Sequence, residues 1–111
     1  MDTKTRTLTK FQLKVLEELT HIPKGMVTTY KILAIRIGVP GSARAIGSAL
    51  KLNPDTSVYP CHRVIKTNLS IGGYFGRIKG DNIDKKMNLL KTEGVIFNSN
   101  GKLVDSSLIW S

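Results

Sequence analysis

The chain has 111 residues and a formal charge of +9, from 17 lysines and arginines against 8 aspartates and glutamates. This length suits one small domain with one core, and a hydrophobic content of 41% argues against disorder over most of the chain. No apolar run approaches the ~20 residues that span a bilayer, and no apolar signal core follows Met1, so we expect a cytoplasmic protein.

A single cysteine excludes an internal disulfide, and with only two histidines it speaks against a structural zinc site. The positive charge suits a polyanionic partner such as nucleic acid, because released counterions drive such binding. The same charge would fit a ribosomal or membrane-surface protein, so it indicates a class of partners without selecting one.

The first helix has a clear start signal after a polar stretch, residues 1–7, which we expect to be frayed. Thr9 can cap it, while the Gln12 side chain reaches back to the cap residue as in a capping box. An apolar stripe follows at a spacing of four residues: Phe11, Val15 and Leu19. Pro23-Lys24-Gly25 then predicts a turn.

Two short helices joined by a tight turn come next. Thr28 or Thr29 can cap the first, which ends at Gly38, and Ser42 can cap the second, from Ala43 to about Leu50. This is a helix-turn-helix pattern, in which the start of the second helix faces nucleic acid. Arg44 lies there, where the helix dipole disfavours a cation unless an external anion receives it. It could also be an ordinary solvated charge.

The chain after this pair predicts short β pieces and one more helix. Val64 and Ile65 begin a buried strand, and Leu69 to Ile71 form a second extended piece. Asp81 or Asn82 caps a fourth helix, which Gly94 ends. An Asn100-Gly101 turn between two apolar runs predicts a hairpin.

The stretch around the single cysteine draws the most attention. Pro60 stiffens the backbone before Cys61, and His62 and Arg63 follow it. A neighbouring base or cation lowers the cost of forming the reactive thiolate. The alternative is an inert buried cysteine beside a surface histidine.

Pro60-Cys61-His62-Arg63-Val64-Ile65 resembles the acceptor motif of the O6-alkylguanine-DNA alkyltransferases, also called methylated-DNA–protein-cysteine methyltransferases. Further motifs follow in the family's order: Thr29-Tyr30, Ala43-Arg44-Ala45-Ile46-Gly47, Asn53-Pro54, Gly72-Gly73-Tyr74, and Leu89-Leu90 before Glu93-Gly94. The resemblance covers Phe11 to Phe97. It implies a C-terminal active-site domain only, without the additional N-terminal domain of most members. We therefore expect a single domain over residues 1–111, mainly helical with small β elements, with a winged-helix-like helix-turn-helix.

The resemblance implies irreversible, stoichiometric transfer of an alkyl group from O6-alkylguanine in DNA, after base flipping, without metal or cofactor. Cys61 would be the nucleophile, and Glu93 would orient His62. Adjacent side chains in extended backbone point to opposite faces, so we expect a proton relay from Cys61 to His62 through one water. Tyr30 would donate to the leaving guanine, and Asn53 would tie its turn to the Cys61 loop. By sequence alone, Glu93 reads as a surface residue and Tyr30 as a half-buried core aromatic.

Arg44 would fill the gap that the flipped base leaves. We expect the other DNA contacts from residues on or near the helix-turn-helix and the acceptor stretch: Thr29, Lys31, Ser42, Ala43, Lys51, Arg63 and Thr67. The substrate pocket would be lined by Val64, Gly73, Tyr74 and Phe75. Phe75 replaces a serine that many members carry, which would alter the pocket's shape and keep a backbone N–H contact. Asn68 replaces a frequent turn glycine and tolerates a positive φ.

We expect a monomer that binds double-stranded DNA containing O6-alkylguanine, associated with the nucleoid when bound. The main alternative is a non-enzymatic, alkyltransferase-like protein that flips the lesion and flags it for another repair pathway. Those proteins share this length but usually carry tryptophan in place of the acceptor cysteine, so Cys61 discriminates. A weaker alternative is a helix-turn-helix transcription factor that ignores the lesion.

Overall fold

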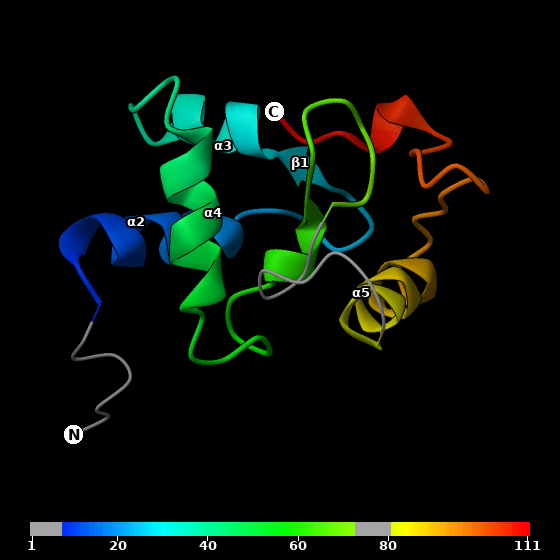
Figure 1. Cartoon of the computed structure of the whole chain (residues 1–111), viewed down its shortest axis with the longest axis horizontal. Coiled ribbons are helices and arrows are strands. Elements are labelled where there is room, and N and C mark those ends of the chain that lie inside the picture. The colour runs from blue at the N-terminus through cyan, green and yellow to red at the C-terminus, as the bar shows by residue number, and fades with distance from the viewer. Residues whose placement is uncertain (1–7, 73–80) are drawn as a thin grey trace.

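The first helix, labelled α2 in Figure 1, begins directly after the cap residue that the sequence predicted. In this computed structural model, which describes residues 8–72 and 81–111, helix α2 spans Lys10–Leu19. The Thr9 hydroxyl accepts a hydrogen bond from the Gln12 backbone N–H at 3.1 Å, and the Gln12 side chain accepts one from the Thr9 N–H at 2.9 Å. The predicted capping box is confirmed, and it fixes where the chain enters the core.

Helices α3 (Tyr30–Arg36) and α4 (Ala43–Lys51) form the predicted helix-turn-helix pair. The hydroxyl of Thr29 caps α3 by accepting a backbone N–H of the first turn at 3.2 Å. The turn between the helices passes through Gly38 and Gly41, whose φ angles of +82° and +86° lie in the region that favours glycine. Glycines at these two positions let the chain reverse between the helices.

A two-stranded parallel sheet joins the two halves of the sequence. Strand β1 (Thr28–Thr29) pairs with β2 (Val64–Ile65), with Thr28 beside Val64 and Thr29 beside Ile65. β1 runs directly into α3, and the one-turn 3-10 helix η1 (Cys61–Arg63) runs directly into β2. The ladder therefore holds the start of α3 next to the cysteine segment, although the two are far apart in sequence.

Helix α5 (Asp81–Thr92) lies on the other side of this ladder from α2, α3 and α4, and it packs against η1 (Figure 1). The predicted hairpin follows it as an isolated bridge between Phe97 and Leu103, and a second bridge joins Lys102 of the same hairpin to Ser70 of the earlier extended piece. The tail then crosses back to β1, where the Trp110 N–H donates to the Val27 carbonyl at 2.6 Å. A second 3-10 turn, η2 (Ser106–Leu108), precedes that contact.

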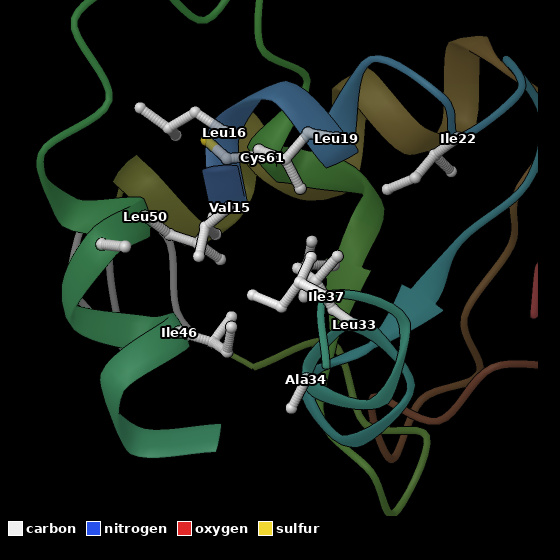
Figure 2. Packing of buried hydrophobic residues seen from close by; sticks show 12 residues of the cluster. Val15, Leu16, Leu19, Ile22, Leu33, Ala34, Ile37, Ile46, Leu50 and Cys61 are labelled. Atoms are coloured by element: carbon white, nitrogen blue, oxygen red, sulfur yellow. The ribbon is translucent and has the colours of Figure 1, made fainter. Parts of the chain in front are cut away.

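The core consists of two clusters of buried apolar side chains. The larger one joins α2, α3, α4 and η1 (Figure 2), and its members are Val15, Leu16, Leu19, Ile22, Leu33, Ala34, Ile37, Ile46, Ala49, Leu50, Cys61 and Val64. The smaller one lies under α5 and the hairpin, with Val27, Ile65, Ile71, Leu90, Val95 and Leu103. Adjacent ladder residues supply both clusters, because successive strand side chains point to opposite faces. Val64 faces the first cluster and Ile65 the second.

The predicted fold class, mainly helical with a helix-turn-helix and small β elements, is confirmed. Within residues 8–72 and 81–111, every helix is too short or too polar to cross a membrane.

Three local expectations are wrong. Cys61 and His62 lie in η1 rather than in an extended segment. Helix α5 already includes Asp81 and Asn82, so neither residue precedes it as a cap. The positive φ in the turn after β2 falls on Leu69, at +70°, and not on Asn68. The Asn68 side chain explains the shift, because its Oδ1 accepts the Ser70 N–H at 3.1 Å and closes a local turn around Leu69.

Candidate active site

Cys61 is placed at the first position of η1, under the helices of the larger core cluster (Figure 2). Its exposed fraction is 5%. Pro60 precedes it with φ −76° and ψ 69°, and this kink ends the loop from α4 and starts the 3-10 turn. The thiol is therefore held on a short, hydrogen-bonded turn between the core and β2.

His62 meets Glu93, the first residue after α5, across a distance of 31 positions in sequence. The two atoms His62 Nε2 and Glu93 Oε2 are 2.9 Å apart, and the side chains are only 7% and 8% exposed. A carboxylate accepts, so Nε2 carries the proton in this pair and Nδ1 of the neutral ring is left as an acceptor. Among the described residues, Nδ1 is buried without a hydrogen-bond partner. The expected pairing of Glu93 with His62 is confirmed as geometry.

Burial lowers the pKa of His62 below its ordinary value of 6.5, and the hydrogen bond that His62 donates to Glu93 only partly opposes this. The nearby cations Arg63 and Lys86 act in the same direction as burial. The imidazole is therefore neutral at pH 7, which is the state that can accept a proton at Nδ1.

Glu93 has a second partner, Arg63, whose guanidinium grips both carboxylate oxygens. Arg63 Nε donates to Oε1 and a terminal nitrogen donates to Oε2, each at 2.9 Å. Burial alone would raise the pKa of Glu93, but the hydrogen bonds from Arg63 and His62 outweigh it and lower that pKa to about 2. The carboxylate is thus ionised throughout the range in which the histidine titrates.

Tyr30 is the first residue of α3, so the β1–β2 ladder holds it near the cysteine segment. Burial, and secondly the neighbouring Cys61, raise the pKa of the phenol above its ordinary value of 10.0. Its hydroxyl therefore stays protonated and can serve as a donor. The ring also forms part of the wall of two surface cavities, described below.

Asn53 behaves as predicted. Its Nδ2 donates to the Tyr59 carbonyl at 2.7 Å, and its Oδ1 accepts the Asp55 N–H at 2.9 Å. The amide side chain thereby connects the end of α4 to the residue two positions before Cys61. With an exposed fraction of 9%, it is itself buried.

Lys86 is a site residue that the sequence analysis missed. Its side chain is 1% exposed, and Nζ donates to the Val64 carbonyl at 2.8 Å and the Ile71 carbonyl at 2.6 Å. Burial lowers its pKa to about 8, and Cys61 is the charge that opposes this shift. The signal was present in the sequence, since Lys86 lies at helical spacing between Ile83 and Leu90, inside an apolar stripe.

The surface beside Tyr30 is hollowed by two cavities. One of about 530 Å³ is lined by Tyr30, Ala43, Arg44, Gly47, Lys66, Thr67 and Asn68. The other, of about 470 Å³, is lined by Tyr30, Lys66, Ser70, Ile71, Gly72, Ile83, Asn100 and Gly101. Arg44, Ala43 and Thr67 are exposed at the first cavity, and Lys31 and Lys51 are exposed on the same helix pair. Half-buried Ser42 occupies the N-cap of α4 without making a side-chain capping bond.

Three candidate residues have other contacts than expected. Thr29 is only 4% exposed, so it presents almost no surface to DNA, and its hydroxyl oxygen accepts the Ile32 N–H at the start of α3. Arg63 is directed inward to Glu93 because that buried carboxylate needs a cation. Val64 is fully buried in the larger core cluster. Gly73, Tyr74 and Phe75 lie outside the described residues.

The described residues contain no group of three or more His, Cys, Asp or Glu side chains arranged to hold a metal ion. The described residues around Cys61 bring together a thiol, a neutral imidazole, a carboxylate and a phenol, which are groups that nucleophilic and general acid–base chemistry uses.

Residues 10–95 match the family model described as "6-O-methylguanine DNA methyltransferase, DNA binding domain". A methylated-DNA–protein-cysteine methyltransferase of Salmonella typhimurium is 43% identical over 88 residues, which cover 79% of this chain and 48% of that protein. The chain spans about half the length of the curated relatives that it matches. The matched domain is the DNA-binding one, and the narrower expectation of a C-terminal domain alone gains no support from these matches.

Two kinds of solved structure share the fold. The structure of S. pombe Atl1 in complex with damaged DNA containing O6-carboxymethylguanine has a TM-score of 0.76 at 32% identity and covers 94% of this chain and 97% of that one. The structure of Mycobacterium tuberculosis OGT in complex with DNA has a TM-score of 0.71 at 40% identity and covers 78% of this chain and 50% of that one.

Proposed function

The chain belongs to the 6-O-methylguanine DNA methyltransferase family, and from that premise we propose that it transfers an alkyl group from O6-alkylguanine in DNA to the sulfur of Cys61. The observation that carries the proposal is the buried Cys61 on a turn that also holds the neutral His62 against Glu93. The S–C bond forms as the bond between O6 and the alkyl carbon breaks. The product is a stable thioether, so each chain would react once and need no cofactor.

The proton of the thiol has to move before sulfur can attack, because the thiolate is the nucleophile. His62 Nδ1 would accept it through one water, and the ring would then be a cation beside the Glu93 carboxylate at 2.9 Å. The proton finally passes to the guanine, which leaves without its alkyl group. Glu93 needs no proton of its own in this sequence, consistent with its pKa of about 2.

Tyr30 and Asn53 would complete the catalytic set. The protonated Tyr30 phenol lies at the start of α3 and would donate a hydrogen bond to the departing guanine, where negative charge develops. Asn53 would act indirectly, because its two hydrogen bonds hold the loop that presents Cys61.

DNA would bind on the surface formed by α3, α4 and the loop after β2. Double-stranded DNA containing O6-alkylguanine is the partner we propose, supported by the charge of +9 and by the DNA in the related Atl1 and OGT structures. Arg44 would enter the gap left by the flipped base. Residues around it would contact the DNA backbone: the exposed Lys31, Ala43, Lys51 and Thr67, and the half-buried Ser42. Residues 1–111 would form one domain and bind DNA as a monomer, in the cytoplasm at the nucleoid.

Mass spectrometry of the intact chain after incubation with a duplex that contains one O6-methylguanine tests the proposal. We expect one methyl group per chain, on the peptide that contains Cys61, and none on a Cys61→Ser variant. An unmodified wild-type chain after long incubation with excess DNA, or many turnovers per chain, would contradict it.

A second candidate function is recognition of the lesion without transfer. Its support is that this chain shares the fold of S. pombe Atl1, whose structure contains damaged DNA with O6-carboxymethylguanine, at a TM-score of 0.76. A lesion-binding protein would retain tight, lesion-dependent affinity for the duplex and leave Cys61 unmodified. A gel-shift titration with methylated and unmethylated duplex, run beside the mass measurement, separates the two functions.

A further inference from the structure

Arg63 makes contacts that a simple surface cation would not make. Its Nε and one terminal nitrogen reach the two oxygens of Glu93 at 2.9 Å, and the other terminal nitrogen donates to the Ile22 carbonyl at 3.0 Å. The Arg63 side chain is 15% exposed. Glu93 Oε2 is shared, since it also lies 2.9 Å from Nε2 of His62. The Glu93 carboxylate therefore accepts hydrogen bonds from a permanently charged guanidinium and from an imidazole at the same time.

We propose that Arg63 is a positioning residue that keeps His62 in its neutral, Nε2-protonated form, ready to accept the proton of Cys61 at Nδ1. The role of His62 as the acceptor of the Cys61 proton rests on the proposed function. The guanidinium is always charged, and it already satisfies the negative charge of Glu93. Protonating His62 would then set two cations against one anion in a buried site, so the neutral ring is favoured.

The charges that face His62 come from η1 and α5. Glu93 and Lys86 belong to α5 or follow it, and Arg63 and Cys61 belong to the same turn as His62. Helix α2, which also packs on η1, contributes no charge that shifts the pKa of His62. Burial is the largest cause that lowers the pKa of His62, Glu93 opposes it, and Arg63 and Lys86 add to the lowering. Arg63 is the cation that directly binds the histidine's own partner.

A purely structural role for Arg63 makes a different prediction. Its hydrogen bond to the Ile22 carbonyl ties η1 to the turn that follows α2. Losing that bond would disturb η1 equally at every pH. Losing the charge would instead let Glu93 and His62 form an ion pair of their own. His62 would then bind a proton at higher pH, and less of the neutral imidazole that accepts the Cys61 proton would be present near pH 7.

The test compares wild type with Arg63→Met, which removes the charge and keeps an unbranched apolar side chain, and Arg63→Lys, which keeps a cation. Arg63→Gln replaces the Met variant if circular dichroism shows that the latter does not fold. Arg36→Met is the matched control, because Arg36 lies beside a glutamate (Glu18, 3.7 Å) elsewhere on the surface. Two quantities are measured: the ¹⁵N NMR titration of the His62 imidazole, and the rate of Cys61 alkylation by methylated duplex from pH 6 to 8.5.

We expect the His62 titration to move to higher pH in Arg63→Met and to stay near wild type in Arg63→Lys and Arg36→Met. The alkylation rate of Arg63→Met, relative to wild type, should fall as the pH is lowered from 8.5 to 6, by up to about 10-fold for each pH unit below the raised pKa of His62, because the neutral imidazole is lost there. An unmoved titration, or a rate loss of equal size at every pH, would overturn the inference. If wild type transfers no alkyl group, the proposed function fails, while the NMR titration still decides the role of Arg63.

Discussion

Replacing Glu93 by glutamine would remove the anion that Arg63 and His62 share, with little change of shape. The pKa of Glu93 is about 2, against an ordinary value of 4.5. At 1.36 kcal/mol for each pH unit, this difference corresponds to about 3 kcal/mol of stability at neutral pH. Removing one partner of a buried ion pair costs about 3–5 kcal/mol of stability, because the remaining charge is left buried. Both arguments therefore predict a similar loss of stability for Glu93→Gln.

The sign of the pH dependence follows from the depressed pKa. The contribution of Glu93 is fully present above pH 4.5 and is lost as the pH falls toward 2. Urea unfolding, followed by circular dichroism, should therefore show Glu93→Gln less stable than wild type by about 3 kcal/mol at pH 7, with the gap closing below pH 4. Glu18→Gln is the control, and its surface pair with Arg36 should contribute at most about 1 kcal/mol. Parallel stability curves of wild type and Glu93→Gln between pH 5 and 2.5 would refute this reasoning.

Three other substitutions test separate parts of the molecule. Arg44→Ala should slow alkylation of duplex DNA and hardly affect a free O6-alkylguanine base, which needs no flipping; equal losses on both would indicate a disturbed fold. Because burial lowers the pKa of Lys86 to about 8 from 10.5, the free energy of unfolding of wild type should rise by about 2 kcal/mol as the pH rises from 8 to 10, and Lys86→Met should lack this rise in urea titrations. Gly47→Ala should raise the stability of α4 by about 0.5–1 kcal/mol, since its Cβ would meet Tyr30 at an ordinary 3.9 Å, and an unchanged melting temperature would contradict this.

Signals that lie within a few residues of each other predicted the local structure well. Thr9 with Gln12, and the glycines at the turn after α3, act through hydrogen bonds and φ angles that the neighbouring sequence alone determines. Asn53 belongs to the same class, because its amide reaches backbone groups only a few positions away. The helices and turns that present the site were predictable for this reason.

Contacts across long stretches of sequence were not predictable in the same way. Arg63 reads as one more cation in a basic chain until α5 brings Glu93 beside it. Lys86 reads as a surface lysine until its Nζ is seen between two buried carbonyl groups. The pairing of His62 with Glu93 was expected only through the family resemblance. In each case the partner is fixed by packing between α5 and η1, about which nearby residues carry no information.

The register of the two-residue ladder of β1 and β2 sets the position of Tyr30 relative to Cys61. Because one strand leads into α3 and the other follows η1, sliding the pair by one residue would displace one group by about 3.3 Å and reverse the faces of the strand. The turn between α3 and α4 lies outside the ladder, and lengthening such a loop by two residues costs well under about 1 kcal/mol of stability. A two-glycine insertion at Gly41 should thus leave alkylation of a free base intact while reshaping the surface offered to DNA. The register of the β1–β2 ladder therefore has to be kept for the chemistry, whereas the length of the turn between α3 and α4 can change in evolution.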